Sequence, residues 1–170
     1  MSRAQALVSI PVGVVIERRR ARSPWTDFIW RPVAVLPGVP DAKPWTTLDG
    51  DADRMNFYGG AAAIELFRSD ASGYRDNLAT GAALLWVALR PTGGEPPFEI
   101  AAVTAEPSEG ETFTENVTDL VETVPMPEPV RAAIAEFVAE HYVEHPFVKR
   151  QRDRANPEAM ARRAPSKDRK

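Results

Sequence analysis

The stretch from Val14 to Gly38 reads VVIERRRARSPWTDFIWRPVAVLPG. It joins two runs of β-branched and aromatic residues through a turn that contains Pro24, which is typical of two successive β-strands. We predict strands over Val8–Arg18 and Phe28–Leu36. Pro32 within the second run favours an edge strand, a bulge or a strand that begins there, because proline cannot donate to a ladder. The stretch therefore indicates a β-sheet protein with arginines and tryptophans gathered near strand ends.

The sequence after this stretch alternates short apolar runs with turn residues, which predicts several more strands and short helices. A continuous apolar run over Ala82–Leu89 favours a central strand, and Phe98–Ala105 is expected to pair back on it as a hairpin. The remaining expected elements are strands at Trp45–Leu48, Asn56–Tyr58 and LVETVPMP, a helix in SDASGYRDNLATG and a short helix that begins with a capping box at SEGE.

The last predicted element is a helix over Glu128–Glu144, ended by Pro146. Its apolar residues recur at the spacing of one helical face: Val130, Ile134, Phe137, Val138 and His141. We therefore predict an α+β fold, a mostly antiparallel β-sheet with one C-terminal amphipathic helix packed on one face. A small β-barrel with a docked helix is the alternative.

Length and charge indicate one domain with a tail. The chain has 170 residues, and we assign residues 1–147 to a single α+β domain. From Pro146 to Lys170 there are nine Lys/Arg and three Asp/Glu, a local charge of +6, whereas the rest of the chain has 12 and 21, a charge of −9. Residues 148–170 also have few large apolar side chains, so we expect a basic, disordered tail.

The apolar run Ala6–Ile16 is too short to span a bilayer and is followed by ERRRAR in place of a small-residue cleavage site. A β-strand explains it better than a signal segment. We therefore expect a cytoplasmic protein that does not associate with membranes.

Several chemistries can be tested against the sequence. The absence of cysteine excludes thiol nucleophiles, disulfides and cysteine-ligated metals. DGDAD at residues 49–53 resembles a calcium loop, but Arg54 and Gly60 stand where that loop needs glycine and glutamate. His141 and His145 have a spacing that can bind a metal, although EHYVEH does not match the zinc-protease motif. We predict no metal site and no catalytic residue.

The arginines and tryptophans of the opening stretch admit two interpretations. They can form a solvated strand end with tryptophans in the core, or a surface that binds an acidic or phosphate-bearing partner. Arginine suits the second role because its guanidinium grips carboxylate and phosphate and stacks on tryptophan. The candidate residues are Arg18, Arg19, Arg20, Trp25, Trp30 and Arg31.

The tail carries the second candidate surface, VKRQRDR. Nucleic acid is not the expected partner, because the acidic remainder of the chain would repel a phosphate backbone. Docking on an acidic partner protein fits the charge better. The candidate residues are Lys149, Arg150, Arg152 and Arg154.

Five segments carry a resemblance: PVGVVIERR, PWTDFIWRPVAVLPG, YRDNL, VPMPEPV and EHPFVKRQRDR. Over about Pro11–Arg154 the chain resembles a family of small bacterial proteins of unknown function. Members often lie beside genes for molybdenum-dependent formate dehydrogenases and their accessory factors. The resemblance implies a link to formate dehydrogenase maturation or assembly, and it implies no catalytic residue.

Two functional hypotheses follow. The first is a non-catalytic accessory protein that needs no cofactor and binds a formate dehydrogenase subunit or a maturation factor through the arginine-rich surfaces. The second is a binder of, or an enzyme acting on, a phosphate-bearing cofactor such as a molybdopterin dinucleotide. In the second case arginines would hold phosphate, and Trp25 or Trp30 would stack on a ring.

Overall fold

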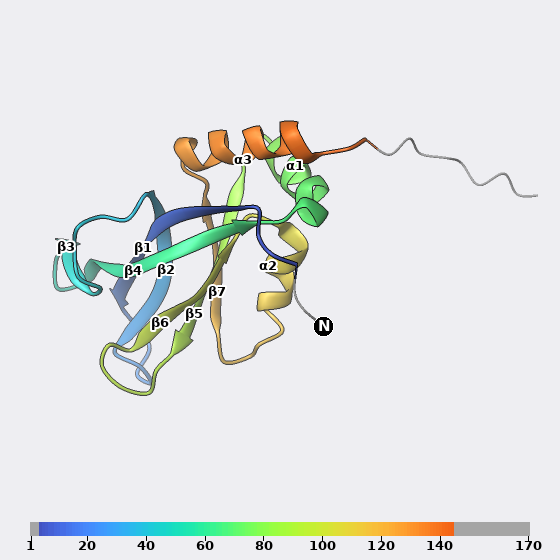
Figure 1. Ribbon diagram of the computed structural model, residues 1–170. Coiled ribbons are helices and arrows are strands. Elements are labelled where there is room, and N and C mark those ends of the chain that lie inside the picture. Colours follow the sequence, from blue (N-terminus) through green and yellow to red (C-terminus); the bar gives the residue numbers. More distant parts are fainter. Residues whose placement is uncertain (1–3, 145–170) are drawn as a thin grey trace, which may run out of the picture.

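The computed structural model describes residues 4–144, which contain two antiparallel sheets (Figure 1). Sheet 1 has the order β2-β1-β4-β3, and sheet 2 has the order β6-β5-β7. The strands are β1 (Val8–Arg20), β2 (Phe28–Pro37), β3 (Thr46–Gly50), β4 (Arg54–Leu66), β5 (Leu84–Pro91), β6 (Phe98–Thr104) and β7 (Leu120–Pro125). The antiparallel, mixed α and β prediction is confirmed.

The opening stretch forms the β1–β2 hairpin. β2 is an edge strand, and the pairing shifts from Val15 opposite Ala34 to Ile16 opposite Pro32. One residue of β2, Val33, is therefore extra in the ladder, which makes a bulge beside the proline. Two of the three alternatives predicted for Pro32, an edge position and a bulge, are therefore both confirmed.

The predicted short strand at Asn56–Tyr58 is part of the much longer β4, which runs through Gly59 and Gly60. The register with β1 shifts at this point, from Val14 opposite Gly60 to Val15 opposite Tyr58. A Cβ on Gly59 would lie 2.5 Å from Ile16 Cδ1, and Gly60 has φ of 130°. The glycine pair therefore forms a bulge inside one strand, and the predicted strand Asn56–Tyr58 was too short.

Sheet 2 contains the predicted β5–β6 hairpin, with β7 on the other side of β5. The predicted fold class named a single packed helix and was incomplete. The described residues also contain α1 (Ala71–Ala79), after a 3₁₀ turn at Arg68–Asp70, and α2 (Pro107–Phe113), where the local patterns predicted short helices. The capping box predicted at Ser108 is displaced. The N-cap of α2 is Glu106, whose carboxylate accepts the backbone N–H of Glu109 at 2.7 Å.

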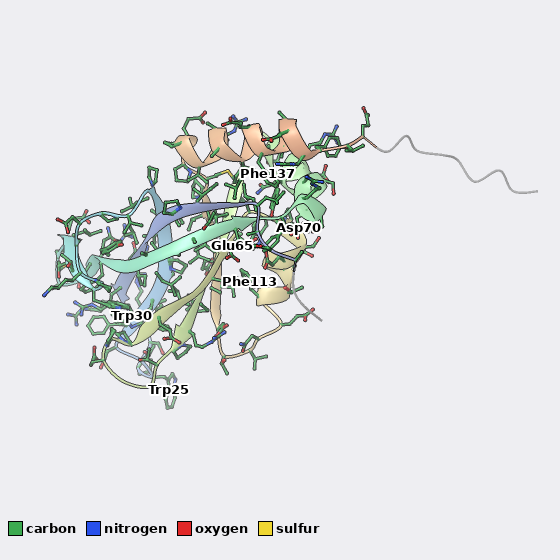
Figure 2. The ribbon with its side chains drawn as sticks, in the orientation of Figure 1. Trp25, Trp30, Glu65, Asp70, Phe113 and Phe137 are labelled. Carbon is green, nitrogen blue, oxygen red and sulfur yellow. The ribbon has the colours of Figure 1, made fainter. Side chains whose placement is uncertain are left out.

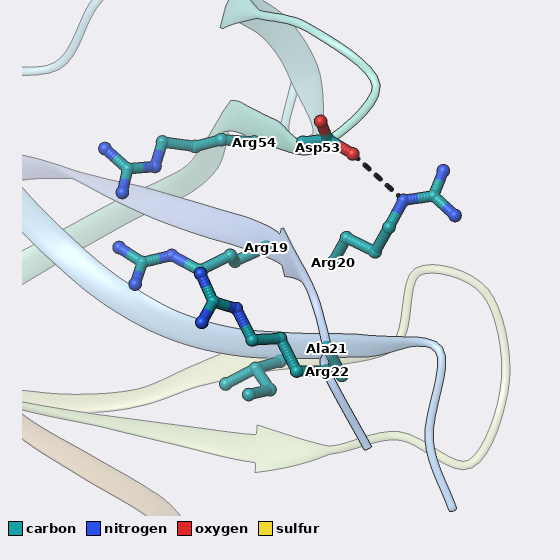
Figure 3. Close-up of a pocket in the computed structure, with 7 residues that line it drawn as sticks. Arg19, Arg20, Ala21, Arg22, Asp53 and Arg54 are labelled. Carbon is teal, nitrogen blue, oxygen red and sulfur yellow. Dashed lines mark hydrogen bonds and ion pairs between the residues drawn. The ribbon is translucent and has the colours of Figure 1, made fainter. Parts of the chain in front are cut away.

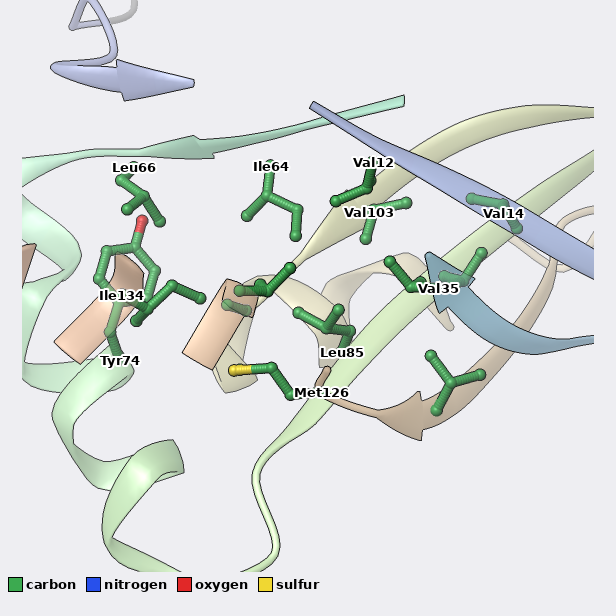
Figure 4. Close-up of a cluster of buried hydrophobic side chains, with 14 of the residues drawn as sticks. Val12, Val14, Val35, Ile64, Leu66, Tyr74, Leu85, Val103, Met126 and Ile134 are labelled. Atoms are coloured by element: carbon green, nitrogen blue, oxygen red, sulfur yellow. The ribbon is translucent and has the colours of Figure 1, made fainter. Parts of the chain in front are cut away.

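Helix α3 (Glu128–His141) lies across one end of the sheets beside α1 (Figure 1). Its Val130, Ile134 and Phe137 are buried as predicted, and Val138 and His141 are partly buried. They join a core made of strand residues and Tyr74 from α1, as Figure 4 shows. The amphipathic pattern therefore located the buried face of this helix correctly.

Neither sheet closes into a barrel. β2 comes close to β7 and β4 close to β6, but within residues 4–144 these strands share no ladder. Side chains fill the space between them, for example where Gly60 lies against Ile100. The barrel alternative was therefore wrong, and the core lies between two open sheets.

Candidate functional site

The consecutive arginines of β1 are divided between the two faces of sheet 1. Val12, Val14 and Ile16 point into the core, so every second residue of β1 lies on this inner face. Arg18 continues that face, and its guanidinium carbon lies 4.5 Å from the centre of the Phe28 ring. Arg19 lies on the opposite, outer face.

Arg18 and Trp30 belong to an aromatic cluster at the inner face. The ring centre of Trp30 lies 5.7 Å from that of Trp45 and 6.0 Å from those of Phe57 and Phe98. The guanidinium of Arg18 is 5.5 Å from the Phe57 ring and 5.9 Å from the Trp30 ring. These contacts are cation–π and ring-packing interactions within the fold, so Trp30 is occupied with its neighbours.

The outer face carries a buried carboxylate, that of Glu17, whose side chain is 6% exposed. Arg31 Nε donates to its Oε1 at 3.1 Å, and Arg19 Nη2 lies 3.2 Å from the same oxygen. Arg54 Nε lies 3.4 Å from Oε2. We call Arg19, Arg31 and Arg54, gathered around Glu17, the arginine cluster.

Strand pairing explains why the arginine cluster forms. Glu17 stands opposite Arg31 of β2, and Arg19 stands opposite Arg54 of β4. Directly opposed residues share a face of the sheet, and residues two apart in β1 do so as well. Three strands thus bring three guanidiniums to one carboxylate.

An open depression of about 600 Å³ adjoins the cluster at the end of β1 (Figure 3). In Figure 3 the side chains of Arg19, Arg22 and Arg54 extend to the same side, whereas Arg20 extends away and pairs with Asp53 at 3.0 Å. The lining residues are Arg19, Arg20, Ala21, Arg22, Ile29, Asp53 and Arg54. Four of these seven are arginines, so the depression is strongly cationic.

The turn before β4 fixes the backbone of Arg54. The carboxylate of Asp51 accepts the backbone N–H groups of Asp53 at 2.8 Å and Arg54 at 3.0 Å. These bonds to the N–H groups of Arg54 and Asp53 lower the pKa of Asp51, because they favour its charged form. DGDAD therefore acts as a structured turn that sets the start of β4.

Two apolar side chains stand exposed at the same end of sheet 1. Trp25, on the loop between β1 and β2, is 93% exposed, and Ile29 of β2 is 52% exposed. Figure 2 places Trp25 at the edge of the molecule, far from Phe137 of α3, with Trp30 set further in. The two tryptophans of the opening stretch thus have opposite surroundings.

The candidate residues named from the sequence fall into separate places. Arg19 and Arg31 lie in the arginine cluster and Arg20 in the depression, whereas Arg18 and Trp30 lie on the inner face. Trp25 is free in solvent. The tail candidates lie outside the described residues; they are Lys149, Arg150, Arg152 and Arg154. His145 also lies outside them.

The candidates named from the sequence left out five residues of this region: Glu17, Arg22, Ile29, Asp53 and Arg54. The alternation of β1 was a usable signal for Glu17, because a strand places it on the face of Arg19. No local signal marked Arg54, since its position depends on the pairing of β1 with β4, far along the chain.

Comparison with known protein families gives one match. Residues 11–151 match the model described as Protein of unknown function (DUF3305). The chain belongs to the DUF3305 family. This agrees with the expected membership of an uncharacterised family. The matched range includes Glu17 and the whole arginine cluster. No curated protein and no solved structure matches the chain.

No helix within residues 4–144 is long and apolar enough to cross a membrane. The same residues contain no group of three or more His, Asp or Glu side chains that could hold a metal ion.

Proposed function

We propose that this DUF3305 protein is a non-catalytic cytoplasmic accessory protein that binds an acidic partner protein through the arginine cluster and the adjoining depression. The observation that carries the proposal is the convergence of three guanidiniums on one buried carboxylate, 3.1 to 3.4 Å away, at an open surface. One carboxylate cannot neutralise three arginines, so positive charge remains for a partner.

The candidate partner comes from the resemblance of the sequence segments to proteins encoded near formate dehydrogenase genes. A formate dehydrogenase subunit or one of its maturation factors would be bound, with the basic tail as a second contact. Support for a protein partner also comes from the exposed Trp25, since tryptophan and arginine dominate the energetics of protein interfaces.

Affinity purification of the tagged full-length protein from its native cell tests the proposal. We expect formate dehydrogenase subunits or maturation factors to be recovered, and to be lost with Arg22→Glu and reduced with a chain that ends at Arg154. Arg131→Glu, the same charge change at an exposed position of α3, is the matched control and should recover them normally. Failure to recover these proteins with the unaltered chain would refute the proposed function.

A phosphate-bearing cofactor is the second candidate ligand, favoured by the four arginines that line the depression. Trp25 is the tryptophan placed to report on it, because Trp30 is held in the aromatic cluster. Titration with inorganic diphosphate should then quench tryptophan fluorescence, and Trp25→Phe should remove most of the change. A flat titration to millimolar diphosphate would remove this candidate.

A further inference from the structure

We infer that the outer face at the end of β1 receives an extended acidic segment of a protein that also carries an apolar anchor. Its carboxylates would meet the arginines of the cluster and the depression, and its apolar side chain would pack on Trp25 or Ile29. The inference rests on the proposed function and names the chemistry of the partner. It also assigns Glu17 the role of a positioning residue.

The first argument is unused hydrogen-bonding capacity. Arg31 and Arg54 approach Glu17 through Nε, so their paired Nη groups remain as donors. The Nη groups form one edge of the fork with which arginine binds carboxylate in a bidentate manner. Arg22 adds a further exposed guanidinium that makes no ion pair within the described part of the chain. The surface is therefore built for several carboxylates.

The second argument is preorganisation by Glu17. Its carboxylate is almost fully buried on the outer face among arginines of three strands, and it holds three long side chains that would otherwise sample many rotamers. Ordering such side chains in advance lowers the entropic cost of binding a ligand. A solvated rim of unrelated arginines would lack this common anchor, so the arrangement favours binding over mere solubility.

The third argument concerns the shape of the site. Small ligands are bound in sites that enclose most of their surface, but this depression is open and not enclosed. Trp25 and Ile29 add exposed apolar area at the same end of the sheet. A cationic surface with an exposed tryptophan and an isoleucine fits an acidic segment with an apolar side chain better than a small phosphate compound.

The test uses the full-length protein and a fluorescein-labelled peptide of six glutamates around one leucine, read by fluorescence polarisation. We expect Arg22→Glu and Trp25→Ala each to weaken binding by about tenfold, the size of a moderate interface hot spot. Arg131→Glu should leave binding unchanged. A peptide with glutamines in place of the glutamates should bind at least about tenfold more weakly, because the arginines then lose their charged acceptors.

Three outcomes would overturn the inference. Equal weakening by Arg131→Glu and Arg22→Glu would mean that only the net charge matters. Binding of inorganic diphosphate that Arg22→Glu removes, without peptide binding, would assign the site to a phosphate-bearing ligand. Peptide binding that Arg22→Glu and Trp25→Ala leave intact would place the contact elsewhere.

The inference and the proposed function can fail separately. Site-dependent peptide binding without recovery of formate dehydrogenase proteins from the cell would uphold the acidic segment and refute the proposed partner. Recovery of those proteins that Arg22→Glu abolishes, with no binding of the peptide, would uphold the partner and refute an extended acidic segment as the ligand.

Discussion

Two arginine–carboxylate sites of this protein differ in the number of guanidiniums that share one carboxylate. At the end of β5, Arg90 donates from Nε and Nη2 to the two carboxylate oxygens of Asp119, at 3.1 and 2.9 Å. On sheet 1, three arginines share Glu17. The two carboxylates are equally buried, with side chains 5% and 6% exposed. Burial is therefore the same, and only the ratio of guanidinium to carboxylate differs.

The difference separates a structural pair from the proposed binding surface. The Arg90–Asp119 bond uses one edge of a single guanidinium and both oxygens of a single carboxylate, and the hydrogen bond to Asp119 raises the pKa of Arg90. Asp119 also accepts from Asn116 at 3.2 Å, so the pair secures the loop before β7. The arginine cluster instead keeps a surplus of charge and donors at the surface.

Removing the anchor of the arginine cluster should have the largest effect on stability. We expect Glu17→Ala to lower the free energy of unfolding by about 2 kcal/mol, because three guanidiniums lose their shared acceptor and repel one another. The loss is limited because these guanidiniums can turn to water. Glu17→Gln keeps an acceptor and should cost about half as much. Urea denaturation measures both, and an unchanged midpoint for Glu17→Ala would contradict the anchoring role.

Removing one arginine from the arginine cluster should affect binding of the acidic peptide more than the stability of the fold. Arg54→Gln should weaken binding of the acidic peptide by about tenfold, equivalent to about 1.4 kcal/mol, whereas Arg90→Gln should leave binding unchanged. Fluorescence polarisation of both variants gives the comparison. Similar losses in the two variants would mean that the balanced pair and the cluster do not differ in function.

Breaking the balanced pair should affect folding alone. We expect Asp119→Ala to lower the free energy of unfolding by about 1 kcal/mol, since one bidentate contact and one amide hydrogen bond are lost, while the Arg90 side chain, 50% exposed, can turn to water. Affinity for the acidic peptide should stay the same. A change in affinity as large as that of Arg54→Gln would show that the two sites are coupled.

The exposed pair of Arg20 and Asp53 supplies the smallest expected effect. Their side chains are 60% and 81% exposed, and water screens such a pair. Arg20→Ala should therefore change the free energy of unfolding by less than about 0.5 kcal/mol. A larger loss in urea denaturation would mean that burial of the carboxylate is not what distinguishes the Glu17 site.

Much of the fold follows from local sequence patterns. The run of Val and Ile in β1 predicted a strand, the helical spacing of α3 predicted which of its side chains are buried, and an edge position and a bulge were two of the three alternatives that Pro32 indicated. The bulge at the glycine pair in β4 had no distinct local signal, because a bulge within a strand and a turn between strands use the same residues. The helix before β5 was predicted, while the N-cap of α2 was placed two residues late.

The site was predictable only in part, for a physical reason. Strand alternation states that Arg18 and Arg19 lie on opposite faces, but it does not state which face the core covers. Arg54 reaches Glu17 only through the pairing of β1 with β4, a long-range contact that no local pattern contains. Trp25 lies in a loop and is exposed, whereas Trp30 lies in a strand and packs on other rings. Their side chains are identical, so the difference in exposure comes from tertiary packing.

The most direct test of the arginine cluster as a binding surface is an NMR titration of the arginine Nη–H signals with the acidic peptide. The signals of Arg19, Arg31 and Arg54 should move together and saturate, while that of Arg90, already paired with Asp119, should stay in place. Equal movement of the Arg90 signal, or a titration that leaves the three cluster signals unmoved, would contradict the account.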